Sequence, residues 1–158
     1  MHCGGIFHAS DSLLHKIHET QQRFLRELGI TEEEAFLQHN FAPSQLRRNI
    51  GILGLMHKRV IGECHPIFRK LLPFCTDVGQ PGYPNGHNKQ LYGHLHTVRL
   101  QMAWYCRSIF AMIYRYNMLP QNVVDSSTVK EFQKHLTLTA RMHCAAGTPE
   151  WQELFSRR

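Results

Sequence analysis

The sequence predicts an all-α protein, an irregular helical bundle of about six or seven helices in two packed subdomains. Apolar residues recur at steps of three and four along most of the chain, which is the spacing of one helix face. Glycines, prolines and Ser/Thr caps separate these segments and mark where helices begin and end. A chain of 158 residues is also long enough to bury a sizeable core.

The first helix is predicted to begin after a cap at Asp11 or Ser10 and to carry an apolar stripe as far as Leu28. Gly29 follows it and suits the end of a helix, because glycine adopts left-handed backbone angles without strain. Thr31 and Glu34 have the spacing of a capping box and predict a short second helix. The apolar stripe of the first helix, interrupted at Gln21 and expected to face the core, comprises Leu13, Leu14, Ile17, Phe24, Leu25 and Leu28.

A third helix is predicted over residues 46–61. Gly51 and Gly54 lie inside it, and an interior glycine costs roughly 1 kcal/mol relative to alanine. We therefore expect another helix to approach closely at these glycines. Pro66 suits the first turn of a short helix that ends near Leu72. The stripe of the third helix comprises Leu46, Ile50, Leu53, His57, Val60 and Ile61.

Residues 73–90 are the clearest loop, because they contain three prolines together with Pro-Gly and Asn-Gly steps. This loop is expected to separate an N-terminal helical subdomain, residues 1–72, from a C-terminal helical subdomain, residues 91–158. Residues 91–102 are interpreted as a helix, although part of this segment alternates in the manner of a strand.

The C-terminal subdomain is predicted to contain a helical hairpin. Its first helix begins near Ser108 and ends before Pro120, which cannot continue a helix. A short connection contains a Val-Val pair, and Ser127 begins the second helix. A last short helix begins at Thr148. Side chains expected in the core of this subdomain include Ile113, Phe132, Leu136 and Trp151.

Composition limits the classes of partner. The net charge of +6 allows contact with a polyanion such as nucleic acid, but a solvated helical surface rich in arginine would have the same balance. The longest apolar run, residues 109–114, is far too short to cross a bilayer, so no membrane partner is expected. Five cysteines at irregular spacing argue against a disulfide framework. They favour an intracellular, reducing compartment, with nucleus and cytoplasm both open.

Twelve histidines and five cysteines raise the question of a zinc site. Structural zinc sites bring their ligands in close pairs, and the histidine pair His94-x-His96 has no matching cysteine pair. We therefore expect neither a bound metal nor another cofactor. Cys144 with His143 or His135 is a weak candidate for a nucleophile and base, because no carboxylate is placed to orient the histidine. No catalytic residue is predicted.

Two strings of residues resemble one protein family. The first comprises residues 47–60, RRNIGILGLMHKRV, with the motif Leu-Gly-Leu-x-His-Lys-Arg-Val. The second comprises residues 107–136, with the motifs Tyr-Asn-x-Leu-Pro-x-x-Val-Val and Val-Lys-x-Phe-Gln-x-x-Leu. In this order they resemble the thumb-side and C-terminal region of non-LTR retrotransposon reverse transcriptases, which are RNA-directed DNA polymerases. Residues 8–36 and the closing string WQELFSRR, residues 151–158, also resemble this region, so the resemblance covers residues 8–158 and lacks the catalytic palm.

The resemblance implies a chain without polymerase activity of its own. Catalysis in this family uses metal-binding aspartates, including the pair in a Tyr-x-Asp-Asp motif. The aspartates here are Asp11, Asp77 and Asp125, and no two are adjacent. The chain is therefore interpreted as a non-catalytic C-terminal fragment. Its implied partners are RNA or an RNA–DNA hybrid and the palm domain of the parent polymerase.

The candidate nucleic-acid-binding residues lie on the third helix and are Arg47, Arg48, Lys58 and Arg59. Arg47 and Lys58 are about three helical turns apart, as are Arg48 and Arg59, so each pair should project from one side and reach phosphates about 16 Å apart. Two alternatives stay open. One is a helical protein–protein interaction module with no nucleic-acid role, and the other is a zinc-dependent DNA-binding regulator. The oligomeric state is not predicted.

Overall fold

A computed structural model describes residues 8–93, 105 and 108–156. These residues confirm the all-α prediction, since they form helices and their only β pairing is an isolated antiparallel bridge between Phe74 and Leu91. The α-helices are α1 (Asp11–Leu28), α2 (Glu32–His39), α3 (Ser44–Val60), α4 (Ile67–Leu71), α6 (Ile113–Asn117), α7 (Gln121–Val124) and α8 (Val129–Ala145). The 3-10 turns are η2 (Thr76–Val78), η3 (Ile109–Met112) and η4 (Trp151–Glu153).

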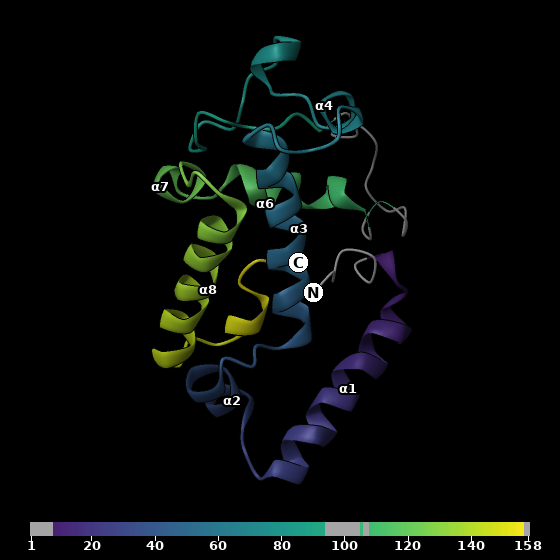
Figure 1. Cartoon of the computed structure of the whole chain (residues 1–158), viewed down its shortest axis with the longest axis vertical. Coiled ribbons are helices and arrows are strands. Elements are labelled where there is room, and N and C mark those ends of the chain that lie inside the picture. The colour runs from purple at the N-terminus through teal and green to yellow at the C-terminus, as the bar shows by residue number, and fades with distance from the viewer. Residues whose placement is uncertain (1–7, 94–104, 106–107, 157–158) are drawn as a thin grey trace.

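The helices α3 and α8 form the centre of the molecule. Figure 1 shows them side by side, with α2 near one end and α6 and α7 near the other. A Cβ atom at Gly54 would lie 2.4 Å from Nε2 of Gln133 on α8, so the predicted close approach is confirmed there. At Gly51 a Cβ would meet nothing within 4 Å among the described residues, and the prediction is wrong for this glycine.

One hydrophobic core draws on helices from both predicted subdomains. The division of the chain at residues 73–90 stays a prediction. Trp151 of η4 stacks on Phe36 of α2 with ring centroids 5.2 Å apart, so the last segment docks as expected, although as a 3-10 turn. Side chains that are buried as predicted include Leu53, Ile113, Phe132 and Leu136.

The helix α1 differs from the prediction in the side that it buries. Phe24 and Leu28 were expected in the core, but they are 50% and 55% exposed. The buried residues of α1 are Leu25 and Gln21, whose amide Nε2 donates to the Ala42 carbonyl oxygen over 3.3 Å. The apolar stripe of α1 is broader than its contact with α2 and α3, so only one edge of the stripe is covered.

The predicted helix ends are largely confirmed. Gly29 has a φ of 69° and ends α1 in the left-handed region. The Thr31 hydroxyl accepts a hydrogen bond from the Glu34 amide at 3.1 Å and begins α2. The cap of α8 is Thr128 rather than Ser127, because the Glu131 amide donates to the Thr128 hydroxyl.

The chain between Ser108 and α8 folds as three short pieces rather than a simple hairpin. After Ser108 the turn η3 leads into α6, and α7 begins after Pro120. The predicted connection with Val123 and Val124 is therefore helical, and both side chains are buried. Of the helix predicted over 91–102, Leu91 lies in the bridge to Phe74 instead, and residues 94–102 lie outside the described part. No helix within the described residues is long and apolar enough to cross a membrane.

Candidate functional site

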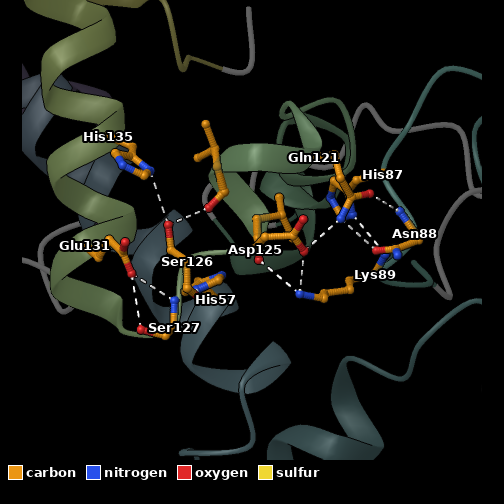
Figure 2. A network of polar contacts seen from close by, with 12 residues as sticks. His57, His87, Asn88, Lys89, Gln121, Asp125, Ser126, Ser127, Glu131 and His135 are labelled. Atoms are coloured by element: carbon orange, nitrogen blue, oxygen red, sulfur yellow. Dashed lines mark hydrogen bonds and ion pairs between the residues drawn. The ribbon is translucent and has the colours of Figure 1, made fainter.

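A buried polar network surrounds His57 of α3 (Figure 2). Its Nε2 lies 3.0 Å from the carbonyl oxygen of Ser126 and therefore donates to it. In this neutral tautomer Nδ1 is an acceptor, and the Tyr116 hydroxyl donates to it over 3.1 Å. The imidazole also stacks on the Phe132 ring, with centroids 4.2 Å apart. His57 therefore connects α3 to α6, to α8 and to the turn between α7 and α8.

Burial determines the protonation states of His57 and Tyr116. It lowers the pKa of His57 and raises the pKa of Tyr116, because each charged form would lose its solvation in the core. Near pH 7 a neutral imidazole therefore faces a neutral phenol. Both side chains are 0% exposed, so they hold helices together and are not placed to exchange a proton with a substrate.

The end of the long loop is attached to α6 by buried side chains. His87 Nε2 donates to the Tyr116 carbonyl oxygen over 3.0 Å, and its Nδ1 accepts from the Lys89 amide. Burial also lowers the pKa of His87. Asn117 makes two hydrogen bonds to the backbone of Leu91, at 2.8 and 2.9 Å. The conformation of this loop therefore depends on side chains of α6.

A second set of contacts attaches the same loop to α7 (Figure 2). Lys89 Nζ lies 2.8 Å from a carboxylate oxygen of Asp125. Gln121 exchanges two hydrogen bonds with Asn88 and donates a third to Asp125. Hydrogen bonds from Lys89 and Gln121 lower the pKa of Asp125, which lies at the surface. The polar residues of this corner are thus engaged with one another.

Ser126 and His135 resemble a nucleophile and its base but do not have the required geometry. The Ser126 hydroxyl donates its hydrogen to the Val123 carbonyl oxygen over 2.8 Å. His135 Nδ1, at 3.2 Å, must then donate to the Ser126 oxygen and cannot accept its proton. Ser126 is also buried. This dyad therefore supports the turn before α8.

The other chemistry-bearing candidates do not assemble into a site. Cys144 is buried, which raises the pKa of its thiol and disfavours the nucleophilic thiolate. No three His, Cys, Asp or Glu side chains of the described residues lie close enough together to hold a metal ion. The pair His94 and His96 lies outside the described residues.

The structure separates the four basic residues that the sequence singled out. Arg48 and Arg59 are buried. Arg59 Nε donates to the Leu72 carbonyl oxygen over 3.0 Å, and its guanidinium lies 4.5 Å from the centroid of Phe74. The expected solvent-facing rows are therefore wrong for these two residues. A long apolar stem and a planar guanidinium allow arginine to be buried where a carbonyl and a ring receive it.

The remaining two candidates lie closer to solvent. Arg47 is partly buried, donates to Gln21 Oε1 over 3.2 Å and lies over the ring of Phe41. Lys58 is exposed near the end of α3. Their role in nucleic-acid binding stays a prediction.

Sequence reasoning missed two basic residues of α4. Arg69 and Lys70 are exposed on α4, which follows α3 at the same end of the molecule (Figure 1). Ion pairs within the described residues are His15–Glu19 and Lys89–Asp125, so Lys58, Arg69 and Lys70 have no acidic partner there. The sequence signal that could have identified them is the Arg-Lys step in the short helix predicted after Pro66. In the structure no residue of this helix is buried.

Comparison of the chain with models of known families, with curated proteins and with solved structures finds no match. Its function is therefore inferred from its residues and their geometry.

Proposed function

We propose that this chain is the non-catalytic, thumb-side and C-terminal part of a non-LTR retrotransposon reverse transcriptase, and that it contacts the nucleic-acid backbone through exposed basic residues. RNA or an RNA–DNA hybrid is the proposed ligand, and the palm of the parent polymerase is the proposed protein partner. Chemistry is assigned to the palm, since no metal-binding aspartate pair is present in this chain.

The observation that supports this proposal is where the two family-like strings meet. His57, from residues 47–60, bonds to Tyr116 and stacks on Phe132, both from residues 107–136. Gly54 of the first string leaves room for Gln133 of the second. A helical pair of arbitrary sequence needs only apolar contacts. Here the polar and glycine positions of the resemblance are the ones that join α3 to α6 and α8.

The proposed contact surface comprises Lys58, Arg69 and Lys70. Cations without acidic partners can neutralise phosphates and release counterions, whereas a buried guanidinium such as that of Arg59 cannot reach a duplex. Binding through phosphates depends little on the nucleotide sequence of the ligand and weakens steeply as the salt concentration rises.

The binding test compares two variants of equal charge. Lys58→Ala/Arg69→Ala/Lys70→Ala removes the proposed surface, and Lys16→Ala/Arg23→Ala/Arg26→Ala removes three exposed cations of α1. We expect the first variant to bind an RNA–DNA hybrid more weakly, with a log–log salt slope smaller by roughly one unit per lost phosphate contact. The α1 variant should keep the slope of the parent chain. Equal affinities and slopes for all three proteins would contradict the proposed surface.

The family assignment has its own test in the DNA upstream of the Met1 codon. We expect a coding segment, in frame or frameshifted, for a polymerase palm with a Tyr-x-Asp-Asp motif. Unrelated DNA at that place would contradict the assignment.

A second candidate function, a helical protein–protein interaction module, is favoured by a different observation. The helix α1 leaves part of its apolar stripe uncovered, with Leu13, Phe24 and Leu28 each at least half exposed. Such a face is typical of helices that bind a partner.

A further inference from the structure

The uncovered apolar stripe of α1 has a defined shape. Leu13, Phe24 and Leu28 are 51%, 50% and 55% exposed, and Ile17 between them is partly buried. At about 100° per residue these four positions fall within an arc of about 60°, and they extend over about 22 Å of helix. They therefore form one continuous strip on one side of α1.

The body of the protein covers a different edge of the same helix. Gln21 and Leu25, the buried residues of α1, are displaced from the strip by a further 20° to 60° or so of helical rotation. Figure 1 shows α1 along the margin of the molecule, diverging from the pair α3 and α8. The fold covers this strip only in part, since Phe24 meets the edge of the Phe41 ring with centroids 6.1 Å apart and still leaves half of its surface exposed.

The charges beside the strip indicate the chemistry of a partner. Lys16 and Arg23 border the strip on the side away from the body, together with Glu27. Lys16 and Arg23 have no ion pair among the described residues, and against the single carboxylate of Glu27 they leave one net positive charge. The border is therefore net positive and would be complemented by carboxylates.

We propose that α1 docks an amphipathic helix of a partner protein, with an apolar side that covers Leu13, Phe24 and Leu28 and acidic residues that pair with Lys16 and Arg23. The strip presents anchors at positions i, i+4, i+11 and i+15, which suit a helix of about four turns lying along α1. This proposal rests on the second candidate function, the interaction module, and its surface is separate from the basic surface of α3 and α4, so peptide binding and nucleic-acid binding are tested independently.

The probe is a fluorescein-labelled synthetic helix with leucine at its a and d positions and glutamate at its flanking positions. A second peptide has lysine in place of each glutamate. We expect the full chain to bind the acidic peptide at least about 10-fold more tightly than the basic one, measured by fluorescence anisotropy in low salt. The double charge reversal Lys16→Glu/Arg23→Glu should invert this preference.

A pair of matched variants tests the apolar strip. Phe24→Ser/Leu28→Ser removes two exposed side chains of α1, and Leu138→Ser/Met142→Ser removes two exposed side chains of α8, which are 46% and 65% exposed. Because all four residues reach solvent, both variants should fold, which circular dichroism checks. We expect at least about 10-fold weaker peptide binding for the α1 variant and unchanged binding for the α8 variant.

Three results would overturn the proposal. The first is equal binding of the acidic peptide by the parent chain and the α1 variant. The second is a dimer of the parent chain in sedimentation equilibrium that the α1 variant does not form, which would assign the strip to a second copy. The third is binding to vesicles containing phosphatidylserine that is lost in the α1 variant, with no binding of either peptide, which would assign the strip to a lipid surface.

Discussion

At the scale of single residues, His57 shows how far a periodic pattern predicts a role. Its place in the apolar stripe of the third helix predicted an inward side chain, and it is fully buried. The stripe did not predict its partners, because Tyr116 and Ser126 are 59 and 69 positions away along the chain. A histidine in a core is expected to be hydrogen-bonded, but the sequence does not say to what.

The His57→Phe variant tests the worth of these hydrogen bonds. Phenylalanine preserves the stack on Phe132 but leaves the Tyr116 hydroxyl and the Ser126 carbonyl buried without that partner. We expect the free energy of unfolding to fall by about 2–6 kcal/mol, since each of the two groups costs about 1–3 kcal/mol. Urea denaturation measures the change. His39→Phe, at an exposed position of α2, is the control and should stay within about 0.5 kcal/mol of the parent chain.

At the scale of elements, we expect substitutions of the two interior glycines of α3 to change the free energy of unfolding in opposite directions. A side chain at Gly54 would collide with Gln133, so Gly54→Val should lower the free energy of unfolding by about 1–3 kcal/mol. Gly51 has room for a Cβ, and Gly51→Ala should raise it by about 0.5–1 kcal/mol through helix propensity. Thermal unfolding of both variants measures the difference. Destabilisation of equal size at both positions would show that α8 is not what requires Gly54.

The sequence predicted where helices begin and end better than it predicted which face of each helix is buried. The Gly29 and Thr31 signals act within a few residues, and both are confirmed. The cap of α8 was misplaced by one residue because three consecutive hydroxyl residues, 126–128, can each serve locally. Pro120 separates α6 from α7 as expected, whereas the hydrogen bonds from His87 and to Leu91 that hold Tyr116 and Asn117 come from a distant part of the chain.

At the scale of the whole molecule, two buried histidines predict a dependence of stability on pH. Burial lowers the pKa of His57 and of His87 in the folded chain, so below about pH 6.5 the unfolded chain binds more protons than the folded one. Their contribution is fully present above the unfolded pKa and is lost as pH falls towards the folded pKa. The slope is at most about 1.4 kcal/mol per pH unit for each group.

Urea midpoints measured between pH 8 and pH 5 test this expectation. We expect a plateau above about pH 7 and a falling midpoint below it. The His57→Phe variant should keep only the His87 part of the slope, although it starts from a lower stability. A slope of the His57→Phe variant equal to that of the parent chain would mean that the His57 imidazole is not buried in neutral form.

The sequence by itself determined the helical class, most helix ends and the core positions Leu53, Ile113, Phe132 and Leu136, because periodicity and caps are local properties. It also determined that the chain has no aspartate pair for two-metal catalysis. The family resemblance is a proposal that begins from such local features, whereas the proposed docking role of α1 begins from the exposure of Phe24 and Leu28 in the structure.

Only the tertiary structure decided which side of each helix meets solvent. Phe24 and Leu28 stay exposed because α2 and α3 cover just one edge of the α1 stripe. Arg59 is buried because the Leu72 carbonyl and the Phe74 ring come to it from another part of the chain. An apolar stripe on a helix indicates which residues could be buried together. Their burial also requires a neighbouring surface, and that surface is assembled from segments far apart in sequence.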